Sequence, residues 1–400
     1  MSRILLGLLT LRILASAFPG NDPAAEMQRR IDKGQLRLAY TEPTGYLTSL
    51  LKALNIPVSS QVLVFAKNSF QLHMISPDNP RAIYFNDDAY VAYVPGSDEL
   101  EIGAIDPKIG SVYYMLNQAR AARPQIKKQG EVQCLVCHDS ALSGDPIPRL
   151  LMLSVLPSPE GSALKAASLI TNDASPMRER WGGWYVTGTH GKQRHLGNTI
   201  VRTPANAIGD MRAFVQTMDL EAGANVTDLS GRFNTRAYLT PHSDLAALMI
   251  LGHQTHVHNL MALAAYKETH PGTDGKSAME IAEQVVRAML FADEVRLTEP
   301  VSGTTSFAKE FSAAGPRDNR GRSLRDLDLK TRLMRFPLSY LIYTKSFDEM
   351  PPQTRQFVVR RLREILTGED TSPDFAYLTP EDRNAILEIL SATKPGWTSR

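Results

Sequence analysis

The sequence predicts an α+β fold, with an antiparallel sheet in the N-terminal half and helices through most of the C-terminal half. Short runs rich in Val, Ile, Tyr and Phe follow one another from residue 61 to residue 115. Runs separated by turn residues about every ten positions are typical of an antiparallel meander. From residue 241 onward, the apolar residues instead recur at helical spacing behind recognisable helix start signals.

The turn clusters of the first half define the predicted strands. Asn86-Asp87-Asp88, Pro95-Gly96-Ser97-Asp98 and Asp106-Pro107 each interrupt an apolar run. Within one run, Leu100, Ile102 and Ala104 alternate with other residues, as in a half-buried strand. The predicted strands are residues 61–66, 81–86, 89–94, 100–105 and 111–115.

Helices are predicted on both sides of this meander. Ser277 and Glu280 form a capping box, and Thr379-Pro380 opens a final helix with a cap and a first-turn proline. Residues 315–323 are polar and lack periodicity, so we expect a loop there. The other predicted helices lie within residues 22–35, 46–54, 243–267, 277–295 and 353–366.

Composition describes an ordinary globular protein. The chain has 400 residues, 43% hydrophobic and 22% charged, with 44 Lys and Arg against 42 Asp and Glu. These values exclude a disordered, collagen-like or multispan membrane protein. The near-zero net charge does not favour nucleic acid as a partner.

The N-terminus has the layout of a secretory signal peptide. Arg3 precedes an apolar run at residues 4–11, and Ala15-Ser16-Ala17 is a small-residue cleavage pattern. Arg12 interrupts the run and leaves an uncleaved anchor, a misassigned start or a buried helix as alternatives. A membrane span needs roughly 20 apolar residues, more than this run offers. We expect residues 1–17 to direct export, followed by a β-meander region (18–235) and a helical region (236–400).

A chemical motif interrupts the loop-rich stretch from residue 130 to 235. Cys134 and Cys137 flank two residues, and His138 follows immediately, giving the spacing of a c-type haem attachment site. Two thiols at this spacing can form thioethers with both vinyl groups of one haem, and the adjacent histidine reaches the iron. A structural zinc site needs two further ligands, and the chain has no other cysteine. A thioredoxin-like dithiol needs a βαβ context that the flanking sequence lacks.

The motif resembles that of c-type cytochromes, which implies that Cys134 and Cys137 hold one haem c covalently and that His138 is an axial ligand. The chain is about four times as long as a simple monohaem cytochrome domain. The segments around residues 181–191 and 242–259 are similar to those of a group of large bacterial proteins with a cytochrome c-type motif. That resemblance implies no particular activity. A dihaem peroxidase would need a second haem motif, which the sequence lacks.

The opposite face of the iron has several candidate ligands. Trp184 and His190 belong to an aromatic and glycine-rich segment that we expect to form a wall of the haem site, because glycines allow close backbone approach and aromatic rings cover a flat cofactor. A sixth ligand is expected to be Met or His. The candidates are Met152, Met177, His190 and His195, or none of them.

Two further groups of residues have a functional and a purely structural interpretation. Four histidines lie on or beside one predicted helix, namely His242, His253, His256 and His258. His253 can line a haem pocket or handle protons, His253 and His256 can together bind a non-haem metal although no carboxylate at helical spacing completes that site, and all four can simply pack between helices. A basic helix provides either a docking surface for an acidic redox partner or an ordinary solvated face. Its arginines are Arg355, Arg360, Arg361 and Arg363.

Three functions follow from one covalent haem. Electron transfer requires a shielded, six-coordinate iron, and the sequence favours it because it needs the fewest additional residues. A haem-dependent oxidoreductase acting on peroxide or a small molecule requires an open distal site with His190 or His253 as acid-base group. The third function is non-redox, either a haem-based sensor or a binding module in which the haem is structural. We expect an exported protein, periplasmic in a bacterium, with a redox partner protein.

Overall fold

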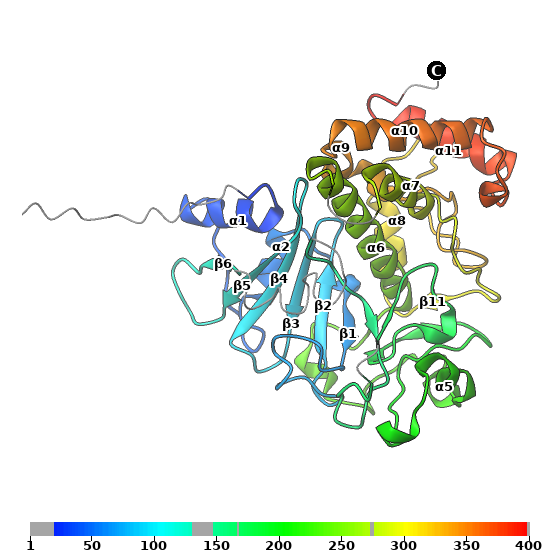
Figure 1. The fold of residues 1–400 in the computed structure, drawn as a ribbon. Helices are drawn as coiled ribbons and strands as arrows, with labels where there is room; N and C mark the ends of the chain where they lie inside the picture. Colours follow the sequence, from blue (N-terminus) through cyan, green and yellow to red (C-terminus); the bar gives the residue numbers. More distant parts are fainter. Residues whose placement is uncertain (1–19, 130–146, 166–167, 273–275, 398–400) are drawn as a thin grey trace, which may run out of the picture.

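The computed structural model describes residues 20–129, 147–165, 168–272 and 276–397 (Figure 1). It confirms the predicted α+β fold. A seven-stranded antiparallel sheet contains most of the N-terminal strands, and the longest helices belong to the C-terminal half. Figure 1 shows α6 and α7 beside the sheet, with α10 and α11 farther from it.

The sheet has the strand order β6-β5-β4-β3-β2-β1-β9, and all neighbours are antiparallel. Strands β1 to β5 coincide with the five predicted strands, which confirms the meander. The sequence did not predict β6 or β9. The strands of the sheet are β1 (Val62–Val64), β2 (Arg81–Phe85), β3 (Ala89–Tyr93), β4 (Glu99–Asp106), β5 (Gly110–Asn117), β6 (Ile126–Lys128) and β9 (Trp184–Tyr185).

Both faces of the sheet are buried. Val62 and Val64 face the hydrophobic cluster that contains α6, whereas Leu63 between them faces the cluster formed with α1 and α2. Trp184 and Tyr185 divide between the same two clusters. A strand that is covered on both faces needs apolar residues at successive positions, which explains why the strand sequences alternate so little. The first helices are α1 (Pro23–Asp32) and α2 (Leu47–Ala53).

The helical half surrounds α6, which is buried over most of its length. A helix that is apolar on all sides is expected inside a protein core. Its neighbours include residues from both predicted regions, since Tyr113, Trp184 and Val285 belong to the same hydrophobic cluster as α6. The helices are α5 (Met211–Thr217), α6 (Leu245–Thr269), α7 (Ala278–Met289), α8 (Phe307–Ala313), α9 (Lys345–Asp348), α10 (Pro352–Thr367) and α11 (Pro380–Thr393).

The N-terminus of α6 is fixed by a buried aspartate. One carboxylate oxygen of Asp244 accepts hydrogen bonds from the backbone N–H groups of Ala246 and Ala247. The other oxygen accepts from the backbone N–H and the hydroxyl of Thr305. Asp244 therefore caps the helix and joins it to the segment before α8.

The predicted capping box of α7 is confirmed, because Ser277 and Glu280 bond to each other's backbone N–H groups. The predicted end of this helix at residue 295 is wrong. The helix ends at Met289, and Phe291 has a φ of 60°, a left-handed conformation that interrupts a right-handed helix. Residues 315–323 contain neither helix nor strand, as expected.

Short elements connect the sheet and the helices. Two small sheets pair β7 (Leu153–Ser154) with β8 (Leu169–Ile170) and β10 (Gly188–Thr189) with β11 (Ser302–Gly303). Among the described residues, no helix combines the length and apolar character that a membrane crossing requires. The 3₁₀ turns are η1 (Val58–Ser60), η2 (Met177–Glu179), η3 (Ala205–Ala207), η4 (Glu221–Gly223), η5 (Thr235–Ala237), η6 (Tyr340–Tyr343) and η7 (Pro373–Phe375).

Candidate functional site

The predicted haem motif, Cys134, Cys137 and His138, lies outside the described residues. The described chain on either side of it contacts the same strand. Before it, the backbone N–H of Gln129 donates to the carbonyl of Tyr113 on β5, at 2.9 Å. After it, the Tyr113 hydroxyl donates to the carbonyl of Arg149 at 2.7 Å. The described chain therefore lies beside β5 both before and after the motif.

The return from this segment is also fixed to α6. Asn259 accepts a hydrogen bond from the backbone N–H of Leu150 and donates one to the carbonyl of the same residue, at 2.9 and 2.7 Å. Such a paired amide contact holds an extended chain as a neighbouring strand would. Residues 149–152 are thereby held between β5 and α6.

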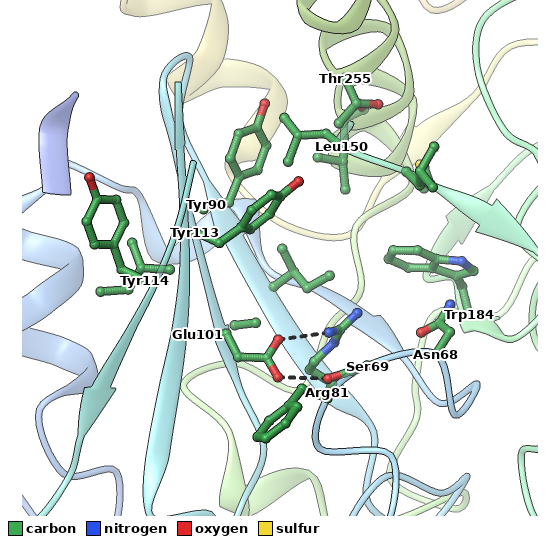
Figure 2. Close-up of a pocket in the computed structure, with 18 residues that line it drawn as sticks. Asn68, Ser69, Arg81, Tyr90, Glu101, Tyr113, Tyr114, Leu150, Trp184 and Thr255 are labelled. Carbon is green, nitrogen blue, oxygen red and sulfur yellow. Dashed lines mark hydrogen bonds and ion pairs between the residues drawn. The ribbon is translucent and has the colours of Figure 1, made fainter. Parts of the chain in front are cut away.

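A cavity of about 130 Å³, which we call the Trp184 cavity, opens beside these residues (Figure 2). Its walls come from the sheet, from α6 and from the chain that follows the predicted motif. Apolar and aromatic side chains predominate. The described lining includes Asn68, Ser69, Arg81, Ile83, Tyr90, Glu101, Tyr113, Leu150, Leu151, Met152, Trp184 and Thr255.

One side of the Trp184 cavity carries an ion pair. Arg81 and Glu101 approach to 3.0 Å, and Ser69 donates to the same carboxylate at 2.7 Å, as Figure 2 shows. Two buried polar atoms of the lining, Nε of Arg81 and Oδ1 of Asn68, have no hydrogen-bond partner within the described chain. Such groups favour a ligand with its own donors and acceptors, because an unpaired buried polar atom costs about 1–3 kcal/mol.

The structure brings together two of the residues that the sequence analysis named. Trp184 and Met152 both line the Trp184 cavity, and the Trp184 indole donates to the carbonyl of Leu153 at 2.7 Å. Met177, His190 and His195 are not among its described lining residues. Of the four candidate sixth ligands, Met152 is therefore the one that shares a cavity with Trp184.

His190 and His195 form a separate buried pair, with ring centroids 4.6 Å apart. The Nδ1 of His190 contacts the carbonyl of Gln193 at 2.7 Å, and its Nε2 accepts the backbone N–H of Asn225 at 2.9 Å. Both ring nitrogens of His190 are thus occupied. Burial, together with the neighbouring His190, lowers the pKa of His195 to about 3, so this ring is neutral at pH 7.

His253 belongs to a buried chain of hydrogen bonds that the sequence analysis missed. Its Nδ1 lies 2.9 Å from a carboxylate oxygen of Asp173, and its Nε2 lies 2.8 Å from the Ser339 hydroxyl. The order of atoms is that of a Ser-His-Asp triad. However, His253 and Ser339 are both fully buried, and Ser339 also caps η6. We interpret the chain as a structural connection between three segments.

The described residues contain no group of three or more His, Cys, Asp or Glu side chains that is arranged to hold a metal ion. His253 and His256, one turn apart on α6, therefore lack the further ligands of a metal site there. Among the other histidines of this helix, His258 is buried and bonds to the carbonyl of Asp87 at 2.8 Å.

The basic helix α10 is largely neutralised by neighbouring carboxylates. Arg361 contacts Glu283, Glu364 and Asp370 within 3.0 Å. Arg360 lies 3.5 Å from Glu364, and Arg355 lies 3.7 Å from Asp348. Arg363 packs over the Trp397 ring at 5.3 Å. These contacts favour a structural use of the arginines over a docking surface.

No protein family, curated protein or solved structure matches the chain.

Proposed function

We propose that this protein is a c-type haem protein that transfers electrons through a single haem outside the cytoplasm. The Cys134–His138 motif carries the proposal, because its spacing matches covalent haem attachment and alternative uses of the two cysteines lack the residues they need. Attachment adds each thiol across one vinyl group of the haem. A C–S bond forms, the thiol hydrogen goes to carbon, and no oxidant is required.

The surroundings of β5 support this proposal. The described residues on both sides of the motif contact β5, and the Trp184 cavity opens at the same strand. Its apolar walls suit a porphyrin edge, and the unpaired Nε–H of Arg81 suits a propionate. The cavity volume of about 130 Å³ is below the ~300–1,000 Å³ of pockets that enclose a ligand. The described cavity alone would therefore not enclose a haem.

Met152 is the proposed ligand opposite His138. It is only 2% exposed, lines the Trp184 cavity and follows the motif closely in sequence. When bound, the haem iron supplies a one-electron couple, and a Met/His ligand pair favours a high reduction potential. As a ligand, Met152 would occupy the position that water or a substrate needs at the iron, and Trp184 would limit the approach of water to the same side. This arrangement favours electron transfer over an open catalytic site.

Export and a redox partner belong to the same proposal. Residues 3–17 carry the signal-peptide pattern, and covalent haem attachment suits an extracytoplasmic protein that cannot recapture lost haem. Electron transfer needs a second protein to supply or accept the electron. Given the neutralised arginines of α10, we do not assign its docking surface to that helix.

Replacing Cys134 and Cys137 with alanine is expected to abolish covalent haem. The chain is produced in an exporting host with c-type haem machinery, and haem is extracted with acidified organic solvent. Wild-type haem should stay with the polypeptide, and haem of the double variant should leave completely, because no thioether remains. Covalent haem in the double variant would contradict the proposal.

Replacing Met152 with leucine should open the iron without removing the haem. Leucine has nearly the volume of methionine and no sulfur, so the ferrous spectrum should shift on adding carbon monoxide, whereas the wild-type spectrum should not. Met177→Leu is the matched control, because Met177 packs against the core away from the Trp184 cavity. A shift already present in the wild type would favour a haem-dependent oxidoreductase instead.

A further inference from the structure

One carboxylate at the end of the sheet has no partner. The side chain of Asp88, in the turn between β2 and β3, is half-buried and makes no hydrogen bond or ion pair with the described chain. Its backbone is fixed, because the N–H donates to Asn86 at 3.1 Å and the carbonyl accepts from Ile105 at 2.9 Å. Burial and the neighbouring Asp87 raise the pKa of Asp88 to about 6, so the carboxylate is ionised at pH 8. A half-buried charge in a fixed position favours a ligand of opposite sign.

Asp88 lines a cavity of about 270 Å³, which we call the α1–α9 cavity. Its other walls come from α1 and the residues just before it, from the end of β4 and from α9. Three carboxylates, two cations and one serine hydroxyl belong to the described lining. The volume lies just below the ~300–1,000 Å³ of pockets for drug-sized molecules, so the cavity suits a small ligand.

The two cations of the lining already have partners. Arg29 pairs with Glu26 at 2.7 Å. The Lys345 ammonium donates to Asn21 at 2.7 Å and lies 3.5 Å from Glu349. Lys345 is near enough to lower the pKa of the unpaired carboxylate, but no ion pair joins the two groups in the described chain. The negative charge at the β2–β3 turn therefore stays available.

The remaining charged neighbours do not compensate Asp88. The third carboxylate of the lining, Asp22, accepts two backbone N–H groups of α1 and the Tyr114 hydroxyl, the latter at 2.6 Å. It adds negative charge and has no cation of its own in the described chain. On its other side, Asp88 lines a neighbouring cavity in which Arg325 is held by Asp87 at 2.8 Å. No described cation on either side is thus left for Asp88.

A buried hydroxyl independently points to a ligand. Ser346, on α9, is 6% exposed and lines the α1–α9 cavity, and its Oγ has no hydrogen-bond partner within the described chain. An unpaired buried hydroxyl is unfavourable, and a ligand N–H would satisfy its oxygen. Among the described residues, no group of three or more acidic, His or Cys side chains is arranged to hold a metal ion. A cation that carries N–H donors therefore fits better than a metal ion.

The apolar part of the lining is short. Ile105 and the prolines Pro23 and Pro107 contribute it. Together with the small volume, this surface suits an alkyl chain of a few carbons beside the charged end. A compact ligand with one ammonium group matches both parts of the cavity.

We propose that the α1–α9 cavity binds a small primary ammonium ion, whose N–H groups donate to the Asp88 carboxylate and the Ser346 hydroxyl and whose short alkyl chain contacts Ile105. The proposal does not require haem, so it stands or falls separately from the function proposed above.

Propylamine is the probe, and two ligands of similar size are its controls. At pH 8 propylamine is protonated, since the pKa of an alkylamine is about 10.4, whereas 1-propanol has no charge and tetramethylammonium has no N–H donor. Binding is measured by calorimetry at low salt, because screening weakens ion pairs near the surface. Propylammonium should bind at one site per chain and at least about tenfold more tightly than either control.

Two substitutions locate the site. Asp88→Asn, which keeps the side-chain shape, should weaken propylammonium binding at least about tenfold, and Ser346→Ala should weaken it about threefold. Asp98→Asn and Ser230→Ala are the matched controls, at exposed positions outside the described lining, and should bind as the wild type does. Equal affinity for propylammonium and 1-propanol, or unchanged affinity in Asp88→Asn, would overturn the proposal.

The stability of Asp88→Asn separates a ligand site from an internal ion pair. If the Asp88 charge is unpaired in the free protein, the variant should unfold at pH 8 at the same urea concentration as the wild type or a higher one. A clear loss of stability, abolished when Lys345→Gln is also present, would show that Lys345 already neutralises Asp88 and would contradict the proposal.

Discussion

Replacing Asp173 with alanine is expected to lower the free energy of unfolding by about 3–5 kcal/mol, because it breaks a buried charged hydrogen bond. Burial alone would raise the pKa of Asp173, but the hydrogen bond from His253 and neighbouring positive charges outweigh it, so the pKa is lowered. Asp173 is therefore ionised and holds the proton of His253 on Nδ1. Its loss leaves that N–H unpaired inside the core.

The substitution also affects the far side of the imidazole. With its proton on Nδ1, His253 accepts through Nε2 from the Ser339 hydroxyl. His253 also stacks on Phe291 with ring centroids 4.1 Å apart. Since Asp173, His253 and Ser339 come from three separate segments, the hydrogen-bond chain fixes those segments relative to α6.

Urea unfolding at pH 7 measures the effect. Asp173→Asn keeps an oxygen that can accept from Nδ1, so it should lose less stability than Asp173→Ala. Ser339→Ala should cost about 1–3 kcal/mol, because it leaves Nε2 unpaired. Asp98→Ala, at an exposed aspartate, should change stability by no more than about 0.5 kcal/mol. If Asp173→Ala and Asp98→Ala unfold at the same urea concentration, the hydrogen-bond chain does not stabilise the protein.

The second large effect is a dependence of stability on pH that arises from His258. Burial lowers the pKa of His258 to about 4, despite its contact with the carbonyl of Asp87. Between pH 6.5 and pH 4, the unfolded chain binds a proton at this ring and the folded chain does not. As the pH falls through this range, the contribution of His258 to the free energy of unfolding therefore falls by about 1.4 kcal/mol per pH unit. The total loss between pH 6.5 and pH 4 is about 3 kcal/mol.

Other groups act with the opposite sign, so the effect must be measured as a difference. Burial raises the pKa of Asp88 to about 6 and that of Glu294 to about 7. Below these values the folded chain holds protons that the unfolded chain releases above pH 4 to 4.5, which stabilises the fold as the pH falls. The pH profile of the wild type is the sum of both kinds of group.

His258→Gln removes one titrating ring and keeps a side-chain N–H that can donate to Asp87. We compare the free energies of unfolding of the variant and the wild type. As the pH falls from 6.5 to 5, the difference between them should change by about 2 kcal/mol in favour of the variant. Val257→Ala is the control, since it removes buried methyl groups from the adjacent position and no titrating group. Its difference from the wild type should be equal at every pH. Parallel curves for both variants would show that His258 does not couple folding to pH.

The sequence predicted those elements whose signals are local. Turn clusters separate β1 to β5, and the cap at Ser277 precedes α7. The end of α7 was missed because Phe291, which has the left-handed conformation after the helix, is not a glycine, the residue that commonly marks a helix end in a sequence. Strands β6 and β9 were missed because two or three residues carry too little alternation to detect.

The candidate site shows the same division. Trp184 was predicted as a wall residue from its aromatic and glycine-rich surroundings, and it lines a cavity together with Met152. The contacts among Asp173, His253 and Ser339 span 80 and 86 residues of sequence, so no local pattern indicates them. His190 was placed in the same wall because it follows Trp184 closely, but its ring turns toward Gln193 and Asn225.

The two outermost strands of the sheet have a consequence for behaviour at high concentration. An exposed strand edge offers free N–H and C=O groups to another chain and so promotes aggregation. Here the edges are only two and three residues long, and β6 ends in the exposed Lys127 and Lys128. The short strands offer a second copy few backbone groups to pair with. The lysine charges further disfavour the approach of a second copy. The described residues of β6 and β9 therefore offer little support to edge-to-edge assembly.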